Sequence, residues 1–416
     1  MTMLGLLILL AMLTSFGLDV TAGVLNLRAL APHPPERFAD VIDQAAWERA
    51  RAYTRDRTIL DLTASGFMLA MLLVWWFMGG FPWLDRVIGA WKLGILGSGV
   101  IYIGALFLLA KLIALPFKII GTFLVEARHG FNRTSIATFV GDKAKSFLLS
   151  LVLGGPFLIA VLYFFQYAGQ WAWLACWGSA SVFLIFIQYL APAWLMPLFN
   201  RFVPLPEGPL RVAIQEYLRG VGFSAPNVYE MDGSRRSTKV NAFVTGFGER
   251  RRIVLFDTMI ARHEVPEVVA VLAHEVGHAR LRHIPKMTLY AVLYLGIMSQ
   301  ILAIAMGMPD LHQAFYMEHL TLHGGLIFFM LLVVPLDLLL GPAMKSLTRR
   351  YEFAADQFAA TTLADPGALA AALKKLAASN LTHLTPHPFH VFLHDSHPPI
   401  LQRIEAIERC ARGESG

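Results

Sequence analysis

The segment VLAHEVGHARLRH (271–283) holds two histidines four residues apart, His274 and His278, with Glu275 directly after the first. Residues four apart lie on one face of a helix, so both imidazoles can be directed at one ion. Glu275 is turned to the side, where its carboxylate can take a proton from water held by that ion. This is the H-E-x-x-H pattern of zinc-dependent proteolysis, in which the ion lowers the pKa of its water and polarises the scissile carbonyl. We expect one Zn²⁺ per chain here; the alternative is two structural histidines on an amphipathic helix.

A catalytic zinc ion needs a third protein ligand and an open fourth position. The segment RRYEFAADQF (349–358) offers Glu352 and Asp356, again four apart on one helix face. Glu352 is the candidate ligand, and Asp356 is suited to bond the free nitrogen of a ligand histidine. In the alternative, Glu352 is a solvated partner of the neighbouring arginines.

Other histidines of the chain are weaker candidates for zinc ligands. His283 is a rival because it follows His278 by five residues. That offset is about 140° around a helix, which turns it away from the metal face. His387, His390 and His394 are interpreted as loop histidines and are assigned no role.

Composition indicates a polytopic membrane protein. Of the 416 residues, 56% are hydrophobic and only 15% charged, whereas a soluble domain is roughly a quarter charged. The net charge of +6 comes without a basic cluster interleaved with aromatics, so we expect the lipid bilayer as a partner and no nucleic acid. Cys176 and Cys410 form neither a metal-binding spacing nor a disulfide framework.

Seven segments are apolar and long enough to cross a bilayer, which takes about 20 residues. They are 3–26, 59–80, 93–117, 147–168, 172–197, 288–308 and 323–341. Six arginines in loop 27–58 and five lysines or arginines in loop 118–146 predict that these loops are cytoplasmic. The same alternation puts the N-terminus outside, and it puts 198–287 and the C-terminal tail in the cytoplasm.

The sequence predicts a division into four parts. Residues 1–197 form a membrane domain with spans one to five, and 198–287 form the first part of a peptidase domain with the H-E-x-x-H helix. Residues 288–341 hold spans six and seven, and 342–416 complete the peptidase domain with the third ligand.

Each polar part has its own expected elements. In the first, PLPEGPLRVAIQEYLRGVG predicts a turn and a helix, and NVYEMD and TKVNAFVTGFGERRRIVLFD predict strands with a hairpin turn around GERR. The second predicts three helices, in RRYEFAADQFAATTL, PGALAAALKKLAAS and PPILQRIEAIERCAR. The fold class is therefore mainly α, with seven transmembrane helices and a cytoplasmic peptidase domain that contains a small β-sheet.

Several motifs along almost the whole chain resemble the integral-membrane zinc metallopeptidases of the CAAX prenyl protease 1 type, in a bacterial-type version. They are AYTRDRT (52–58), VEARHGFNRTS (125–135), APAWLMPLFNRFVPLPEGPLR (191–211), STKVNAFVTGFG (237–248), LAHEVGH (272–278), RRYEFAADQFA (349–359) and HDSHPPILQRI (394–404). Phe243 and the sequence FAAD are mild departures from the family pattern, and they bear on specificity.

The resemblance implies a gluzincin-like site with His274, His278 and Glu352 as zinc ligands and Glu275 as general base. It also implies the following roles for residues outside that core: Asp356 beside the ligands, the Asn241 strand and Arg403 at the substrate, and His397 at the scissile peptide. An extended edge strand can add a peptide, and a histidine can stabilise an oxyanion. Without the resemblance, SHPPILQR is also a plain helix start with Ser396 as cap.

The expected function is a zinc-dependent membrane endopeptidase that uses metal-activated water, with peptide or protein substrates that include prenylated CaaX proteins. The alternatives are a general quality-control zinc protease of the membrane and a non-enzymatic membrane protein with a structural zinc. The expected location is the cytoplasmic (inner) membrane, or the endoplasmic reticulum in a eukaryote.

Overall fold

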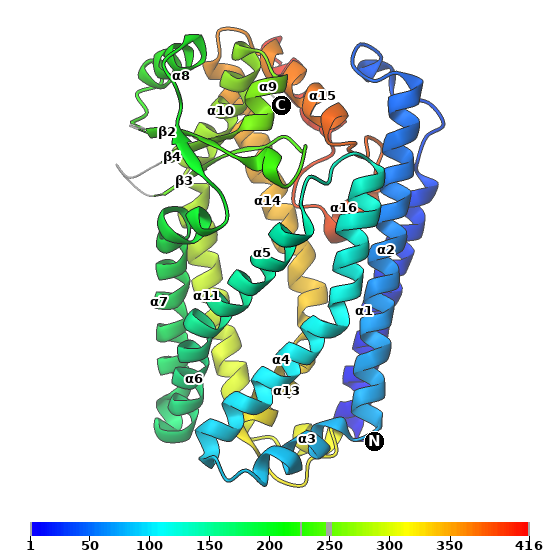
Figure 1. The fold of residues 1–416 in the computed structure, drawn as a ribbon, viewed down its shortest axis with the longest axis vertical. Helices are drawn as coiled ribbons and strands as arrows, with labels where there is room; N and C mark the ends of the chain where they lie inside the picture. Colours follow the sequence, from blue (N-terminus) through cyan, green and yellow to red (C-terminus); the bar gives the residue numbers. More distant parts are fainter. Residues whose placement is uncertain (1, 225–226, 247–251, 415–416) are drawn as a thin grey trace.

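The computed structural model describes residues 2–224, 227–246 and 252–414. They form a long helical assembly that carries a cap of shorter helices and a small sheet at one end (Figure 1). The short helix α3 (Gly80–Gly89) lies at the opposite end. The molecule is thus divided into a membrane part and a polar cap.

The membrane part consists of long apolar helices. They are α1 (Met3–Arg28), α2 (Gln44–Phe77), α4 (Gly94–Ile120), α5 (Ile136–Leu149), α6 (Gly155–Tyr167), α7 (Ala172–Leu190), α11 (His283–Met306), α13 (Leu322–Leu332) and α14 (Val334–Thr362). The π-helical turns η2 (Gly121–Glu126), η3 (Ser150–Gly154) and η5 (Ala191–Leu195) continue or join them. Short 3₁₀ and α-helical pieces complete the connections: η1 (Glu36–Phe38), η4 (Gly169–Trp171), η6 (Met196–Leu198) and α12 (Pro309–Ala314). A further 3₁₀ turn, η7 (Gly233–Arg235), belongs to the cap.

Within the described residues, six helices, counted with their π-helical continuations, are long and apolar enough to cross a membrane, and α13 with α14 makes a seventh if the pair is one broken span. The span expected over 323–341 falls on α13 and the first part of α14, with a break between them. α13 and α14 meet at 51°, and Pro335 lies in the first turn of α14, where it cannot donate a backbone hydrogen bond. The helix expected from Arg349 is confirmed, but it is the C-terminal part of α14, which continues to Thr362.

The cap holds a four-stranded sheet within the described residues, in the order β1-β2-β4-β3. The strands are β1 (Phe202–Pro204), β2 (Asn227–Met231), β3 (Ala242–Thr245) and β4 (Arg252–Phe256). β3 pairs antiparallel with β4, with Ala242 opposite Leu255, and leaves its other edge free of strands. The strand predictions are confirmed, while the turn expected around GERR lies outside the described residues.

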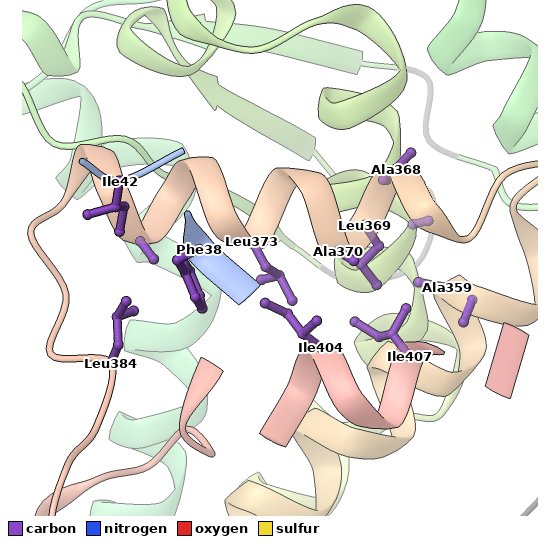
Figure 2. Close-up of a cluster of buried hydrophobic side chains, with 14 of the residues drawn as sticks. Phe38, Ile42, Ala359, Ala368, Leu369, Ala370, Leu373, Leu384, Ile404 and Ile407 are labelled. Carbon is purple, nitrogen blue, oxygen red and sulfur yellow. The ribbon is translucent and has the colours of Figure 1, made fainter. Parts of the chain in front are cut away.

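The cap helices surround this sheet and the last helical turns of α14. They are α8 (Pro209–Gly220), α9 (Asp257–Arg262), α10 (Val265–Arg280), α15 (Gly367–Ser379), α16 (Pro388–His394) and α17 (Ile400–Ala411). Figure 2 shows the core between α15 and α17, which the loop before α2 completes by inserting Phe38. Phe38, Ile404 and Ile407 are almost fully buried, and each such side chain stabilises the cap by roughly 1.5–3 kcal/mol. This packing holds α17 against α14.

Helices α10 and α14 approach closely at Gly277, the fourth residue of HEVGH. A Cβ at Gly277 would lie 3.1 Å from both Cα and the carbonyl oxygen of Ala355. Because backbone atoms cannot give way as a flexible side chain does, a larger residue here would push the two helices apart by a few tenths of an ångström. The close approach sets the face of α10 that carries His274 and His278 against the face of α14 that carries Glu352.

Candidate active site

Helix α10 is a buried element with a well-defined start. Pro266 lies in its first turn, and the Glu267 carboxylate accepts a hydrogen bond of 2.9 Å from the Glu264 N–H. Apolar residues on most sides of the helix enter the cap core. The imidazole of His274 is therefore held inside protein, with 6% of the residue exposed.

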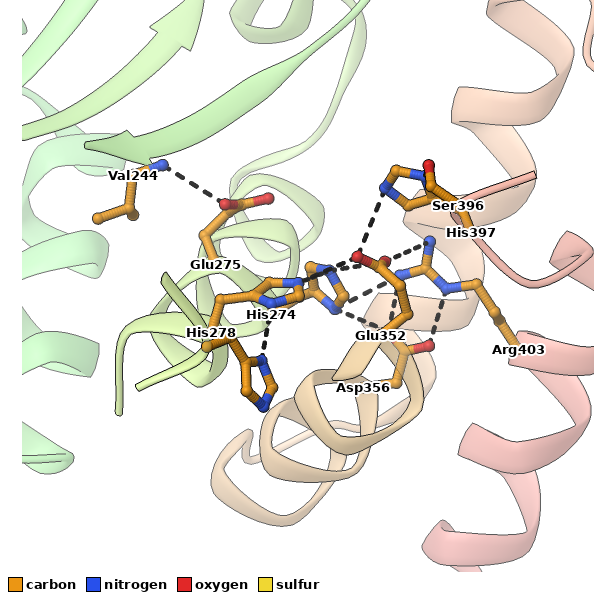
Figure 3. Close-up of polar contacts among 10 residues, drawn as sticks. Val244, His274, Glu275, His278, Glu352, Asp356, Ser396, His397 and Arg403 are labelled. Atoms are coloured by element: carbon orange, nitrogen blue, oxygen red, sulfur yellow. Dashed lines mark hydrogen bonds and ion pairs between the residues drawn. The ribbon is translucent and has the colours of Figure 1, made fainter. Parts of the chain in front are cut away.

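Three side chains converge between α10 and α14 (Figure 3). His274, His278 and Glu352 each offer a ligand atom, and these atoms lie within 4.8 Å of one another. The two Nε2 atoms of the histidines are 3.1 Å apart. Glu352 Oε1 is 3.3 Å from His278 Nε2, and Glu352 Oε2 is 3.5 Å from His274 Nε2.

These separations fit a bound zinc ion. Tetrahedral ligands at about 2.0–2.1 Å from zinc lie about 3.3 Å from each other. Glu352 is buried, and its Oε2 has no hydrogen-bond partner in the described structure, although a buried carboxylate oxygen normally has one. Two imidazoles and one carboxylate are also the donors of a catalytic zinc site, whereas structural sites are closed by four ligands and are often rich in cysteine. Glu352 is therefore not a solvated partner of the neighbouring arginines.

Asp356 and Arg403 lie behind these donors. Asp356 Oδ1 accepts a hydrogen bond of 2.8 Å from His274 Nδ1, which leaves Nε2 of that ring directed at Glu352. Arg403 donates from Nε and Nη2 to the two oxygens of Asp356 at 2.8 and 2.7 Å. Burial disfavours the protonated His274 ring, but its contacts with Asp356 and Glu352 outweigh burial and raise the pKa of His274 to about 9.

Arg403 was predicted to touch the substrate, and its contacts suggest an additional role. It is 8% exposed, and Nη1 lies 3.7 Å from Glu352 Oε2. Burial opposes its charge, yet the bidentate bond with Asp356 raises the pKa of Arg403 above its usual range. A buried, doubly bonded guanidinium fixes the orientation of both carboxylates. Substrate contact by Arg403 stays a prediction, since the side chain also lines the cavity described below.

His283 lies closer to the donor group than its helical offset from His278 predicts. Its Nδ1 lies 2.9 Å from Nδ1 of His278, and its ring stacks on Tyr351 with centroids 4.2 Å apart. The helical offset of 140° did not apply, because α10 ends at Arg280 and Arg282 adopts a left-handed conformation, φ 56°. His283 thus contacts a candidate ligand from behind and is not part of the three-residue donor group. The feature of the sequence that could have indicated this contact is a histidine placed just after the end of a helix.

Glu275 faces the sheet. Figure 3 shows its carboxylate turned toward β3, where Oε2 accepts a hydrogen bond of 3.4 Å from the Val244 N–H. Asn241 lies just before the same strand, and its Oδ1 accepts a hydrogen bond of 2.9 Å from the Ala242 N–H. The predicted base and the predicted substrate strand are therefore neighbours.

A cavity of about 140 Å³ connects these groups. Polar side chains line one part of it: Asn241, His274, Glu275, Glu352, His397 and Arg403. Apolar side chains from three helices line the rest: Met259, Val271, Leu369, Leu373 and Leu376. A polar reactive end thus opens onto a small apolar pocket.

His397 approaches from the loop before α17. Its Nε2 lies 3.4 Å from Glu352 Oε1 while its side chain is 63% exposed, so it can reach both the donor group and solvent. The reading of Ser396 as a helix cap is wrong. α17 begins at Ile400 with Pro399 as its N-cap, and the Ser396 hydroxyl lies 3.0 Å from His397 Nδ1 instead.

The helical assembly and the site define an integral-membrane metalloendopeptidase, and comparisons with known proteins give its family. Residues 24–201 match the family described as CAAX prenyl protease N-terminal, five membrane helices, and residues 204–411 match Peptidase family M48. The chain belongs to the CAAX prenyl protease 1 family of membrane metallopeptidases, as the sequence motifs predict.

Relatives match over nearly the full length. The CAAX prenyl protease 1 homolog of Arabidopsis thaliana is 32% identical over 400 residues, which cover 92% of this chain and 93% of that protein. The human homolog is 28% identical over 423 residues, 90% of this chain and 89% of that protein. The crystal structure of S. mikatae Ste24p superposes with a TM-score of 0.92 at 25% identity, covering 98% of this chain and 100% of that chain.

Proposed function

We propose that this protein is a zinc endopeptidase that cleaves proteins ending in a prenylated CaaX motif, in which two aliphatic residues and one variable C-terminal residue follow the cysteine. The observation that carries the proposal is the His274, His278 and Glu352 donor group, whose neighbour Glu275 bonds β3, the last strand in the order of the sheet. Names of the relatives, CAAX prenyl protease 1, support the substrate class. The cavity supports it too, because apolar side chains of α9, α10 and α15 line one part of it and can contact an aliphatic side chain of the substrate.

The proposed roles follow from the contacts. His274, His278 and Glu352 hold one Zn²⁺. When bound, zinc acts as a Lewis acid on the scissile carbonyl and lowers the pKa of water. Glu275 takes a proton from the attacking water and passes it to the leaving amine. The reaction adds water across the peptide bond and releases two chains.

Other residues orient the reactants. Asp356 holds His274 through Nδ1, and Arg403 holds Asp356 and Glu352. The strand that follows Asn241 pairs with the substrate backbone, since β3 is a sheet edge. His397, partly exposed beside Glu352, donates to the oxyanion that develops on the scissile carbonyl.

The proposed location and domain organisation follow from charge and order along the chain. The positively charged loops put the cap in the cytoplasm, in the inner membrane of a bacterium or the endoplasmic reticulum of a eukaryote. The cap combines 198–287 and 342–416, while 1–197 and 288–341 supply the spans.

Labelling by a membrane-impermeant maleimide tests the orientation. In a Cys410→Ser background, Glu216→Cys on α8 reacts with reagent added on the cytoplasmic side, and Trp91→Cys, after α3, reacts with reagent added on the other side. The reverse pattern contradicts it.

The direct test of function compares a farnesylated CaaX peptide with its unprenylated twin, using purified protein loaded with zinc. We expect cleavage after the cysteine, with a higher kcat/KM for the farnesylated peptide, and loss of cleavage in Glu275→Gln. Equal cleavage of both peptides would favour a general quality-control protease. Cleavage of neither peptide by protein with full zinc occupancy would favour a structural zinc.

A further inference from the structure

Asn380 makes a two-point contact with the backbone just before the edge strand. Its Oδ1 accepts a hydrogen bond of 2.9 Å from the Val240 N–H, and its Nδ2 donates one of 3.2 Å to the Val240 carbonyl. A side-chain amide bonded in this way reproduces the contacts that a residue of a paired strand would make. Val240 is 3% exposed, so these two bonds satisfy buried groups.

The direction of the backbone groups shows why this position matters. The Asn241 carbonyl accepts from the Phe256 N–H and so faces β4. Val240 bonds Asn380, and the Val244 N–H bonds Glu275, so even-numbered residues face away from β4. Successive residues of a strand alternate in this way. The strand-pairing edge therefore includes Ala242 and Val244, whose N–H groups bond the side chains of Asn241 and Glu275, and it ends at Val240.

Asn380 is also fixed relative to the cavity. It follows α15 as its C-cap, and its N–H bonds the Leu376 carbonyl at 3.0 Å. Leu376 and Leu373 line the apolar pocket. Asn380 is four residues beyond Leu376 and continues the same helix face. One face of α15 thus forms the pocket wall and then closes the strand edge.

We propose that Asn380 is a positioning and specificity-determining residue, which ends the substrate-pairing edge at Val240 and so limits how many residues can follow the scissile bond. The inference rests on the proposed function. Antiparallel pairing is somewhat more stable per residue than parallel pairing, and it directs the C-terminal residues of a substrate toward Val240. A substrate that ends shortly after the cleaved bond fits this edge, and a longer one meets Asn380.

The test measures kcat/KM for a farnesylated CaaX peptide, for versions extended by one or two residues beyond X, and for versions extended at the N-terminus. In the parent, C-terminal extension lowers kcat/KM. In Asn380→Ala, the Val240 groups are open, and the ratio of extended to unextended kcat/KM rises about fivefold, mainly through KM, which corresponds to about one hydrogen bond. N-terminal extension has the same effect in both proteins.

Thr258→Val is the matched control, because Thr258 bonds the Lys239 carbonyl at 2.8 Å without facing the pairing edge. It lowers stability but leaves the ratio unchanged. Asn380→Asp keeps the acceptor for the Val240 N–H and gives an intermediate ratio. Hydrogen exchange of the Val240 amide, which needs no activity, is faster in Asn380→Ala than in the parent or Thr258→Val.

An unchanged ratio in Asn380→Ala overturns the inference, as does a change only for N-terminal extensions or an unchanged Val240 exchange rate. A different result would contradict the proposed function itself: the parent protein cleaves no CaaX peptide of any length.

Discussion

His283 Nδ1 lies 2.9 Å from Nδ1 of His278, so a histidine from the start of α11 supports a candidate ligand at the end of α10. Such a contact fixes the ring and the tautomer that leaves Nε2 free for a metal. The two helices are joined at this point by the left-handed Arg282. The membrane helix α11 is therefore coupled directly to the donor group.

Removing this support is expected to weaken metal binding without abolishing it. In His283→Ala, the zinc affinity falls about 10- to 100-fold, the usual cost of losing a partner behind a ligand. Competition with a chelator of known affinity measures the change. His319→Ala, which changes an exposed histidine in the connection between α12 and α13, serves as control, and equal affinity in both variants would contradict the role of His283.

Replacement of the proposed base separates catalysis from metal binding. In Glu275→Gln the shape is kept but no carboxylate can take a proton, so kcat falls about 10²- to 10⁴-fold. Zinc content, measured by mass spectrometry, stays at one per chain. Glu216→Gln on α8, an exposed carboxylate, keeps parental activity. Near-parental turnover in Glu275→Gln would refute the assignment.

The buried pair of Arg403 and Asp356 is expected to be costly to break. Arg403→Met leaves the carboxylate of Asp356 buried with one partner fewer, and the free energy of unfolding falls by about 3–5 kcal/mol. Thermal unfolding in detergent, with and without zinc, measures the loss. Arg412→Met removes an exposed arginine that is paired with Glu414 and changes stability little. Comparable losses in the two variants would rule out a special role for Arg403.

Zinc affinity is expected to rise with pH because His274 must lose a proton to bind a metal through Nε2. The pKa of His274 in the folded protein, about 9, lies above the ordinary histidine pKa of 6.5. In the metal-free protein, this proton stabilises the fold fully below pH 6.5, and that stabilisation is lost as pH rises through 9. Affinity should therefore increase up to about tenfold per pH unit over this window and then level off.

Titration calorimetry in buffers of different ionisation enthalpy checks this dependence through the number of protons released per zinc. His274→Ala removes the contribution. An affinity that is flat from pH 6.5 to 9 would show that the proton is absent before zinc binds.

Local pattern was sufficient to predict the parts of the site. The spacing of His274 and His278, and of Glu352 and Asp356, fixes which side chains share a helix face. Strands β2, β3 and β4 followed from their short apolar runs between turn residues, whereas β1 was not predicted. The long apolar runs predicted the membrane helices, although Pro335 broke the last one.

Contacts between distant segments could not be predicted in the same way. Arg403 was assigned to the substrate, yet its guanidinium is bonded to Asp356, because the packing of α17 against α14 chooses its partner. The position of the His283 side chain depends on where α10 ends. The apolar periodicity of α10 does not encode that end. Asn380 gave no sequence signal, since a single asparagine after a helix most often marks a turn.

The sequence by itself determined the chemistry of this protein: two imidazoles, a carboxylate ligand and a base at helical spacing, in a chain apolar enough for the membrane. The tertiary structure alone decided which groups support that chemistry from behind and where the substrate edge ends. The reason is physical. Helix and strand periodicity are properties of neighbouring residues, whereas a buried hydrogen bond between segments 140 residues apart, such as Asn380 to Val240, exists only once the core has packed.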